Sequence, residues 1–342
     1  MRNSIIPHVS VRLVNRFFKK RFWLASATRR NRTFNRIVKK VMFEGDDMIV
    51  VPKNTVARRR TVETDISVED AGARTVLPSD VVKRALSMTD DIFIMDFCLC
   101  RKSTGCKDYP VDKGCIFLGN GVHRIPEDFG HVATREEAER YVDECSDLGF
   151  VHIIGKNRLD SLWLHTGRKN DLMTICNCCP CCCLWNVTRD ISDDIASVYR
   201  RMDSVEVTVD AEKCIGCGIC TEACFTRATS IKGNRCDIDQ ALCRGCGRCA
   251  DMCPRDTITV TYDPASIPRE AEALGSLFQF HQSPRRSMVS SLSGPRLMMS
   301  AGTFRYLSMN SMYSLISPGS SSYPALTRAE VSFHPFHPLR FS

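Results

Sequence analysis

Two runs of cysteine in the second half of the chain have the spacing of metal ligands. Each run follows a C-x2-C-x2-C-x3-C pattern, and the second run is closed by a proline. This spacing holds cubane [4Fe–4S] clusters, and eight thiols in two copies of it indicate iron–sulfur ligation and electron transfer. The eight residues are Cys214, Cys217, Cys220 and Cys224 in the first run and Cys243, Cys246, Cys249 and Cys253 in the second.

The chemistry of a cubane explains why the two runs belong together. A cubane needs one thiolate for each iron, and cysteines at positions i, i+3 and i+6 place three sulfur atoms on one tight loop, which the intervening glycines permit. In two-cluster proteins the last cysteine of each run serves the other cluster, so we expect crossed ligation. The predicted sets are Cys214, Cys217, Cys220 and Cys253 for one cluster, and Cys243, Cys246, Cys249 and Cys224 for the other.

Apolar and polar residues alternate on both sides of the two runs, as they do in strands. The pattern covers residues 205–209 before the first run and residues 258–262 after the second. With the repeated cysteine spacing, it makes residues 204–263 resemble a bacterial-type two-cluster ferredoxin, which implies two β–α–β halves related by a pseudo-twofold axis. Phe225 follows Cys224 where that family has proline; this loosens a turn and removes no ligand.

A second group of cysteines lies between residues 98 and 183, and its spacing is less regular. Our hypothesis is a third metal centre, such as another iron–sulfur cluster, because several thiols can converge on one site. A structural zinc site and redox-active dithiols are the alternatives. Adjacent cysteines rarely bind the same metal, so we expect only a subset to be ligands. The candidates are Cys98, Cys100, Cys106, Cys115, Cys176, Cys178, Cys179, Cys181, Cys182 and Cys183.

Residues 70–262 as a whole resemble a group of anaerobic prokaryotic iron–sulfur proteins. The shared features are a Cys-x-Cys-Arg segment at 98–101, a Gly-Cys-Ile-Phe-Leu-Gly segment at 114–119, a Cys-Asn-Cys-Cys-x-Cys-Cys-Cys run at 176–183 and the two runs that follow. The resemblance implies a redox function and a cysteine-rich domain in front of the ferredoxin-like one. It implies no particular substrate.

The elements between these cysteines predict a domain of mixed helix and strand. Residues 92–95 and 150–154 have the pattern of apolar strands. Helices are expected at 79–88 and from Thr134, where Glu137 occupies the capping-box position. The predicted fold class is α+β, with a ferredoxin-like dicluster domain appended to a cysteine-rich α/β domain and with flexible basic termini. The predicted divisions are a basic N-terminal arm at 1–60, the cysteine-rich domain at 61–203, the dicluster domain at 204–263 and a disordered tail rich in Ser, Met and Pro at 264–342.

Charge is distributed unevenly along the chain. The net charge is +13 over residues 1–60, −9 over residues 61–264 and +4 over residues 265–342. An acidic middle is typical of an electron carrier that docks on basic redox partners. For the basic arm we favour a solvated segment that packs a few apolar side chains on the domain below it. The alternatives are an amphipathic helix that contacts an anionic membrane or an acidic partner, and a transit peptide.

Composition favours a reducing, cytoplasmic setting. The chain has 20 cysteines in 342 residues, and it is far too long for a small disulfide-stapled domain, so the cysteines are expected to be metal ligands. Its apolar stretches stay well below the roughly 18 residues that a membrane-spanning helix requires, and we find no nucleic-acid recognition motif. For the tail, an interaction segment and a frame shift near Gly275 are the alternatives to disorder.

Electron transfer is the function that these features predict. The expected protein is a ferredoxin-type carrier that passes single electrons through two [4Fe–4S] clusters to or from a partner oxidoreductase. One alternative is an oxidoreductase in its own right, with a substrate or a third cluster in the Cys98–Cys183 region. Another is a redox- or metal-responsive interaction protein. Structural roles are expected for Cys145, Cys236, His123, His131, His152 and His165.

Overall fold

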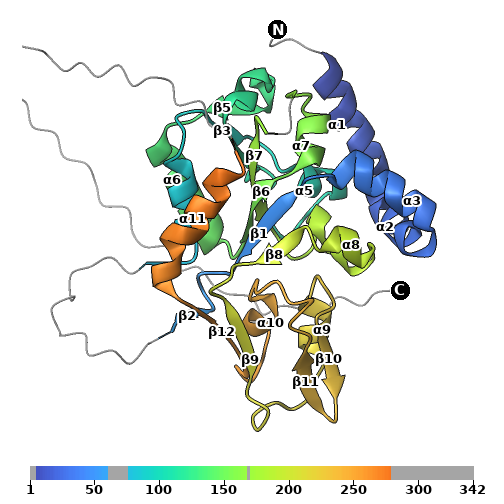
Figure 1. The fold of residues 1–342 in the computed structure, drawn as a ribbon, viewed down its shortest axis with the longest axis vertical. Helices are drawn as coiled ribbons and strands as arrows, with labels where there is room; N and C mark the ends of the chain where they lie inside the picture. The colour runs from blue at the N-terminus through green and yellow to red at the C-terminus, as the bar shows by residue number, and fades with distance from the viewer. Residues whose placement is uncertain (1–4, 61–75, 168–169, 279–342) are drawn as a thin grey trace, which may run out of the picture. The chain divides into compact units, whose positions relative to one another are not determined.

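A seven-stranded sheet forms the centre of the described part of the chain (Figure 1). The computed structural model describes residues 5–60, 76–167 and 170–278. Neighbouring strands are antiparallel, except for one parallel pair at the edge, β1 and β8. In sheet order the strands are β5 (Gly130–Val132), β3 (Ile92–Met95), β4 (Ile116–Leu118), β7 (Met173–Cys178), β6 (Val151–Lys156), β1 (Asp47–Val51) and β8 (Tyr199–Arg201).

Apolar side chains explain why these segments form inner strands. Every residue of β3, β4 and β7 is buried, which is the pattern of a strand covered on both faces. Ile94 pairs with Ile116, and Ile116 pairs with Ile175, so a row of β-branched side chains crosses the sheet. Strands β3 and β6 lie where apolar strands were predicted, at 92–95 and close to 150–154.

Three helices pack on one face of the sheet: α4 (Asp80–Leu86), α6 (Arg135–Asp147) and α11 (Ile267–Ser276). Helix α6 begins as predicted, because the Thr134 side chain accepts a hydrogen bond from the Glu137 N–H at 3.2 Å. The buried face of α6 carries Ala138 and Val142, which join the same apolar core as Ile94 and Ile116 of the sheet.

Helix α11 lies inside the segment that was predicted to be a disordered tail, 264–342. Its residues Ile267, Ala271 and Leu274 are buried against the main core, and Glu270 accepts a hydrogen bond from the Asp203 N–H at 2.7 Å. Burial of this apolar face stabilises the helix. Residues 279–342 of the predicted tail lie outside the described residues.

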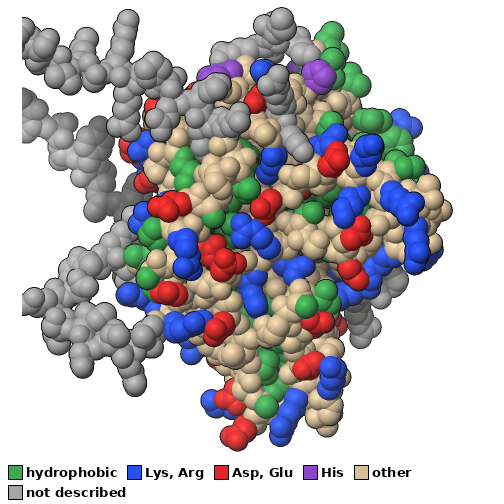
Figure 2. Space-filling view, viewed as in Figure 1, with side chains coloured by type: hydrophobic (Ala, Val, Ile, Leu, Met, Phe, Trp, Pro, Cys, Tyr) green, Lys and Arg blue, Asp and Glu red, His purple; other side chains and the backbone are tan. Residues whose placement is uncertain are grey.

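The N-terminal segment differs from the predicted arm at 1–60. It forms α1 (Ile5–Phe17), α2 (Arg21–Arg30) and α3 (Arg32–Val38) and then enters the sheet as β1, whose last four residues are buried. Ala25, Val38 and Phe43 pack on the face of the sheet opposite α6. Figure 2 shows Lys and Arg side chains gathered over α2 and α3, at the right of the view. The segment therefore keeps its basic surface while its apolar side chains complete the core.

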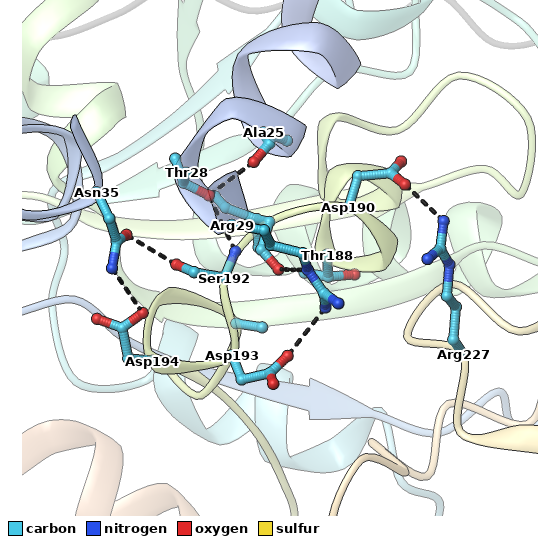
Figure 3. A network of polar contacts seen from close by, with 12 residues as sticks. Ala25, Thr28, Arg29, Asn35, Thr188, Asp190, Ser192, Asp193, Asp194 and Arg227 are labelled. Carbon is cyan, nitrogen blue, oxygen red and sulfur yellow. Dashed lines mark hydrogen bonds and ion pairs between the residues drawn. The ribbon is translucent and has the colours of Figure 1, made fainter. Parts of the chain in front are cut away.

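Polar contacts hold these N-terminal helices to the segment that follows the last cysteine of the 176–183 run (Figure 3). Arg29 donates to the Ile191 carbonyl at 2.7 Å and pairs with Asp193 at 2.9 Å. The Ser192 N–H donates to Thr28 Oγ1 at 3.0 Å. From the other side Arg227, between the two ferredoxin-like runs, pairs with Asp190 at 2.6 Å. Residues 190–193 thus contact both the N-terminal helix α2 and the loop between the two cysteine runs.

In the sequence, the two ferredoxin-like cysteine runs lie between two strands of a smaller sheet. Strands β9 (Glu206–Val209) and β12 (Ile258–Tyr262) pair antiparallel, close to the predicted strands, and β2 (Ala57–Arg59) adds to β12 in parallel. Strand β2 comes from the N-terminal segment, so a third strand joins the unit predicted at 204–263. The remaining elements of this part are the hairpin β10 (Thr229–Lys232) and β11 (Arg235–Ile238), and the short helices α9 (Ile219–Ala223) and α10 (Arg248–Asp251).

The predicted divisions at 60, 203 and 263 do not separate compact units in the structure, because all of the described residues belong to one unit. Hydrogen bonds cross the first two divisions: the Lys53 N–H donates to the Cys246 carbonyl at 3.2 Å, and Thr188 Oγ1 donates to the Phe225 carbonyl at 2.7 Å. Within the described ranges, none of the helices is both long and apolar enough to cross a membrane. The remaining α-helices of the described residues are short: α5 (Leu99–Thr104), α7 (Arg158–Trp163) and α8 (Asp193–Ala196).

Candidate metal centres

One small cavity, of about 20 Å³, is lined by cysteines from both ferredoxin-like runs. Cys214, Cys217 and Cys220 reach it from the loop before α9 and from the first turn of that helix, and Cys253 reaches it from the end of the second run. Cys217 is exposed, whereas Cys220 is buried. These are the four residues that crossed ligation predicts for one cluster.

A second cavity of about 20 Å³ is lined by the other four cysteines. Cys243, Cys246 and Cys249 come from the second run, and Cys224 comes from the end of the first run, at the C-terminal cap of α9. The last cysteine of each run therefore faces the other run's cavity. Both sets consist of four thiols around a small space, which is the donor set that a cubane cluster requires.

Glycines at matching positions in the two runs let the backbone turn around each cavity. Gly216 and Gly245 have φ angles of +65° and +66°, a region that residues with a Cβ rarely adopt. A Cβ on Gly216 would lie 2.4 Å from the Asn234 carbonyl oxygen, and one on Gly245 would lie 2.7 Å from a methyl group of Val205. Both positions therefore require glycine for conformation and for space.

Hydrogen bonds to sulfur favour the thiolate form of the two crossed cysteines. Cys224 Sγ accepts the Ala228 N–H at 3.2 Å, and Cys253 Sγ accepts the Thr257 N–H at 3.5 Å. Burial opposes ionisation of both thiols, but hydrogen bonds from nearby threonines and backbone N–H groups outweigh it and lower the pKa of each. By contrast, burial raises the pKa of Cys246 to about 11. The two crossed cysteines thus favour the thiolate form more than Cys246 does.

Cys236 also lies at the first cavity, although it stands outside both runs. Its Sγ is 3.4 Å from Cys220 Sγ, and its backbone N–H donates to Cys214 Sγ at 3.3 Å. Cys236 is buried, as expected, and it lies beside the candidate ligands of the first cluster. Sequence spacing could not reveal this, because the hairpin β10–β11 carries the residue back to the loop.

The geometry of the eight cysteines agrees with a family comparison. Residues 213–257 match the family model described as a 4Fe-4S dicluster domain. No curated protein and no solved structure matches the chain. Because the match covers the two runs and the thiols converge in four-membered sets, the chain contains a ferredoxin-type iron–sulfur domain.

The ten cysteines between residues 98 and 183 divide into two groups. Seven of them line a cavity of about 390 Å³, which is far larger than the ferredoxin-type cavities. Helix α1 covers part of this cavity with Leu13 and Val14, and Asp160 and Trp163 of α7 line another part. The lining cysteines are Cys98, Cys100, Cys115, Cys176, Cys178, Cys179 and Cys183.

The environment of this larger cavity holds most of its thiols in the neutral form. Burial raises the pKa of Cys178, and the hydrogen bond with Cys98 together with burial raises the pKa of Cys100. Cys98 differs, because hydrogen bonding with Cys100 and the charge of Arg101 lower its pKa to about 7. Burial also raises the pKa of Asp160. The cavity lining therefore combines thiols held in the neutral form with Cys98 and with Cys179, whose pKa values are both lowered.

The second group brings four sulfur atoms close together. Cys106, Cys179, Cys181 and Cys182 have their Sγ atoms within 4.8 Å of one another, and no other set of three or more His, Cys, Asp or Glu ligand atoms in the described ranges is as compact. Cys179 belongs to both groups. Hydrogen bonding from Cys181 and the charge of Arg101 hold the pKa of Cys179 at about 5.

Two buried arginines, to which the sequence assigned no role, flank these groups. Arg101 is fully buried and donates to the Asn177 carbonyl at 3.1 Å and to the Lys113 carbonyl, with its guanidinium over the Phe150 ring. Burial disfavours its charge, but Cys98 and Cys179 outweigh this effect and raise its pKa. A buried cation is costly unless anionic or polar partners surround it, so Arg101 indicates a site that collects negative charge.

Arg248 connects the ferredoxin-type part with the cysteine-rich part. It lies in α10, beside the ligand candidate Cys249, and donates to the Cys179 carbonyl at 2.8 Å and the Cys178 carbonyl at 3.4 Å. Its other terminal nitrogen donates to Asn186 at 3.1 Å. The arginine therefore fixes the second ferredoxin-type cavity against the turn that carries the compact thiols.

Proposed function

We propose that the chain is an electron-transfer protein that carries single electrons through two [4Fe–4S] clusters, one held by each crossed set of four cysteines. The observation that carries the proposal is the pair of cavities, each lined by three cysteines of one run and by the last cysteine of the other run. When bound, such clusters supply reversible one-electron oxidation and reduction. The protein supplies the thiolates, the N–H donors to sulfur and the apolar surroundings that adjust the reduction potential.

The first cavity is the proposed point of exchange with a redox partner protein. Cys217 is exposed there, and Ile215 and Ile219, which line the same cavity, are 59% and 36% exposed. Exposed apolar residues around a redox site suit a transient protein contact, which excludes water without requiring a large interface. The partner we propose is an oxidoreductase that gives or accepts one electron at a time.

The second cavity faces the interior of the same compact unit. Cys246 packs beside the apolar cluster that contains Cys178 and Cys183, and Arg248 donates to the carbonyls of Cys178 and Cys179. This arrangement supports an electron route that leads from the exposed first set, through the second set, toward the cysteine-rich part. The redox partner determines the direction in which electrons move along this route.

Reductive titration of the anaerobically purified chain tests this function. We expect about eight irons and eight acid-labile sulfides in the ferredoxin-type part, and uptake of about two electrons that are returned to a one-electron acceptor. A matched variant, Cys217→Ala with Cys246→Ala, removes one ligand from each set and should abolish the reversible uptake by these clusters. Reversible uptake that persists in the variant at the wild-type level would contradict the proposal.

A second candidate function is an oxidoreductase whose substrate binds in the cavity of about 390 Å³. Its size and its mixed lining of thiols, Asp160 and apolar side chains favour this alternative, because small-molecule sites are apolar clefts with a few polar groups. An enzyme would turn over with the purified chain alone. The test is reoxidation of the reduced chain by small disulfides without a partner protein, compared with Cys178→Ala; equal rates in both would exclude catalysis through this thiol.

A further inference from the structure

We propose that Cys106, Cys179, Cys181 and Cys182 bind one thiophilic divalent metal ion, zinc(II) or iron(II), in tetrahedral coordination. The set includes the adjacent pair Cys181 and Cys182, a pairing that is rare on one metal, because the turn after β7 brings their Sγ atoms within 3.4 Å of each other. This mononuclear site is separate from the two ferredoxin-type clusters, and it does not depend on the proposed electron transfer. It assigns four of the ten irregularly spaced cysteines to one centre and leaves six around the larger cavity.

The distances between the sulfur atoms carry the proposal. Cys181 Sγ lies 3.6 Å from Cys106 Sγ, 3.7 Å from Cys179 Sγ and 3.4 Å from Cys182 Sγ, and all four atoms lie within 4.8 Å of one another. Four sulfur atoms at about 2.3 Å from a tetrahedral ion are about 3.8 Å apart. The observed set is therefore close to the size of a single-ion shell.

The same distances exclude a cubane at this site without rearrangement of the chain. In a cubane each thiolate binds a different iron, and the iron and sulfide atoms between the thiolates hold them further apart. The ferredoxin-type cysteines follow this looser pattern, since neither of their sets reaches the compactness of the Cys106 group among the described residues. One chain thus contains both arrangements, and the difference is in the spacing of the sulfur atoms.

The surroundings of the four thiols suit a centre with net negative charge. Four thiolates on a divalent ion carry a net charge of about −2, which needs compensation in a partly buried place. The buried guanidinium of Arg101 interacts with Cys179, and its Nε has no hydrogen-bond partner in the described structure. The Cys182 N–H donates to Cys179 Sγ at 3.4 Å. Positive charge and a backbone N–H are therefore already directed at the sulfur atom of Cys179.

Position in the fold gives the site a structural consequence. Cys106 follows Gly105, the left-handed cap of α5, whereas the other three cysteines form the turn after β7. Cys106 and Cys181 are 75 positions apart in the sequence, so an ion between them ties two distant segments together. Both segments also carry cysteines of the larger cavity, and the metal would hold that cavity's wall in place. Binding releases the protons of those thiols that are not already ionised.

One side of the proposed site is closed by apolar side chains and the other is open. Cys145, Phe150, Cys179 and Cys182 form a buried cluster, and Tyr109 packs against it. Cys181 remains exposed, which provides a path for the ion to enter. Cys145 is a buried thiol of the same cluster that is not part of the four, so it supplies a matched control.

Metal analysis and X-ray absorption spectroscopy on the full, anaerobically purified chain test the proposal. We expect either about one zinc per chain, with a zinc spectrum that shows four sulfur neighbours at about 2.3 Å, or about one iron in excess of acid-labile sulfide. The two arms distinguish the metals, because cubanes contain equal iron and sulfide whereas a mononuclear iron site contains no sulfide. The spectrum of the wild-type chain needs no variant and therefore no assumption about folding.

Two variants locate the ion. Cys106→Ser should lose it, or lower its affinity at least tenfold in a chelator competition, whereas Cys145→Ser should keep it; the iron and sulfide of the ferredoxin-type clusters should be unchanged in both. A wild-type chain with neither metal, a zinc shell that is not four sulfurs, or equal losses in the two variants would overturn the proposal. So would a parallel loss of about four irons and four sulfides in Cys106→Ser, which would indicate a cubane instead.

Discussion

The two cysteine-rich regions of the chain place their thiols by different means. In the ferredoxin-type region, short loops with left-handed glycines such as Gly216 present three sulfur atoms each, and the fourth arrives from the other run. In the region between Cys98 and Cys183, the thiols come from β7, from α5 and from separate loops, and the sheet brings them together. Local spacing sets the first arrangement, whereas tertiary structure sets the second. Substitutions should therefore act locally on the first and globally on the second.

The largest expected effect comes from paired substitutions that separate crossed from uncrossed ligation. Cys220→Ser with Cys253→Ser removes two ligands from one crossed set, so about four of eight irons should remain. Cys220→Ser with Cys249→Ser removes one ligand from each set and should lose about eight. Iron and sulfide analysis with EPR of the reduced chains measures both. If ligation were uncrossed, the two double variants would lose the same amount of iron.

In the other region the corresponding test concerns the stability of the whole fold. Arg101→Met should lower the free energy of unfolding by about 3 kcal/mol, because it leaves the Asn177 and Lys113 carbonyls without their buried donor. The measurement is chemical denaturation under anaerobic conditions. Arg140→Met, at an exposed position of α6, serves as the control and should change the value by less than about 0.5 kcal/mol. Equal effects of the two substitutions would contradict the structural role of Arg101.

A pH effect is expected from the region between Cys98 and Cys183. His152 is buried between Ser146 and Asn177, and burial lowers its pKa from 6.5 to about 4. The folded chain favours the neutral form of His152. The contribution of this residue to the free energy of unfolding is therefore fully present above about pH 6.5, and up to about 3 kcal/mol of it is lost as the pH falls toward 4.

The measurement is the free energy of unfolding as a function of pH. His152→Gln should flatten the profile between pH 6.5 and 4, whereas substitution of the half-exposed His123 should leave the slope as in the wild type. A slope that persists in His152→Gln would show that another group is responsible.

The smallest effect is predicted at Cys236, the thiol beside the first ferredoxin-type cavity. Cys236→Ala should keep all the iron of the clusters, because the crossed set already supplies four ligands. Its backbone N–H, which donates to Cys214 Sγ, is retained in the variant. Iron analysis and a redox titration of the two chains measure the result. Loss of about four irons would mean that Cys236 is itself a ligand.

Much of the ferredoxin-type region could be predicted from the sequence because its information is local. The C-x2-C-x2-C-x3-C spacing identified eight of the nine cysteines that line the two cavities, and the alternation of residues 205–209 and 258–262 located β9 and β12. The start of α6 at Thr134 followed from its side-chain cap in the same way. Each of these features depends on neighbours within a few positions.

The remaining features depend on contacts between distant residues and could not be predicted. Met48–Val51 is an apolar run, but it lies in a segment whose high positive charge indicated an arm, and only its pairing with β6 makes it an inner strand. The division of the ten cysteines depends on Cys106 meeting a turn about 75 positions away. The roles of Arg101 and Arg248 were hidden because charged side chains are usually exposed.

Strand β2 has a consequence for synthesis and for the dissection of this protein. Its residues 57–59 leave the ribosome about 200 positions before the partner strand β12 at 258–262, so the smaller sheet closes only when nearly all of the described chain has been made. Contacts so distant in sequence slow folding. A fragment cut at residue 204 would expose the edge of β12 that β2 covers, and an uncovered edge recruits other chains. The iron–sulfur part is therefore expected to be soluble and monomeric only with its N-terminal segment attached.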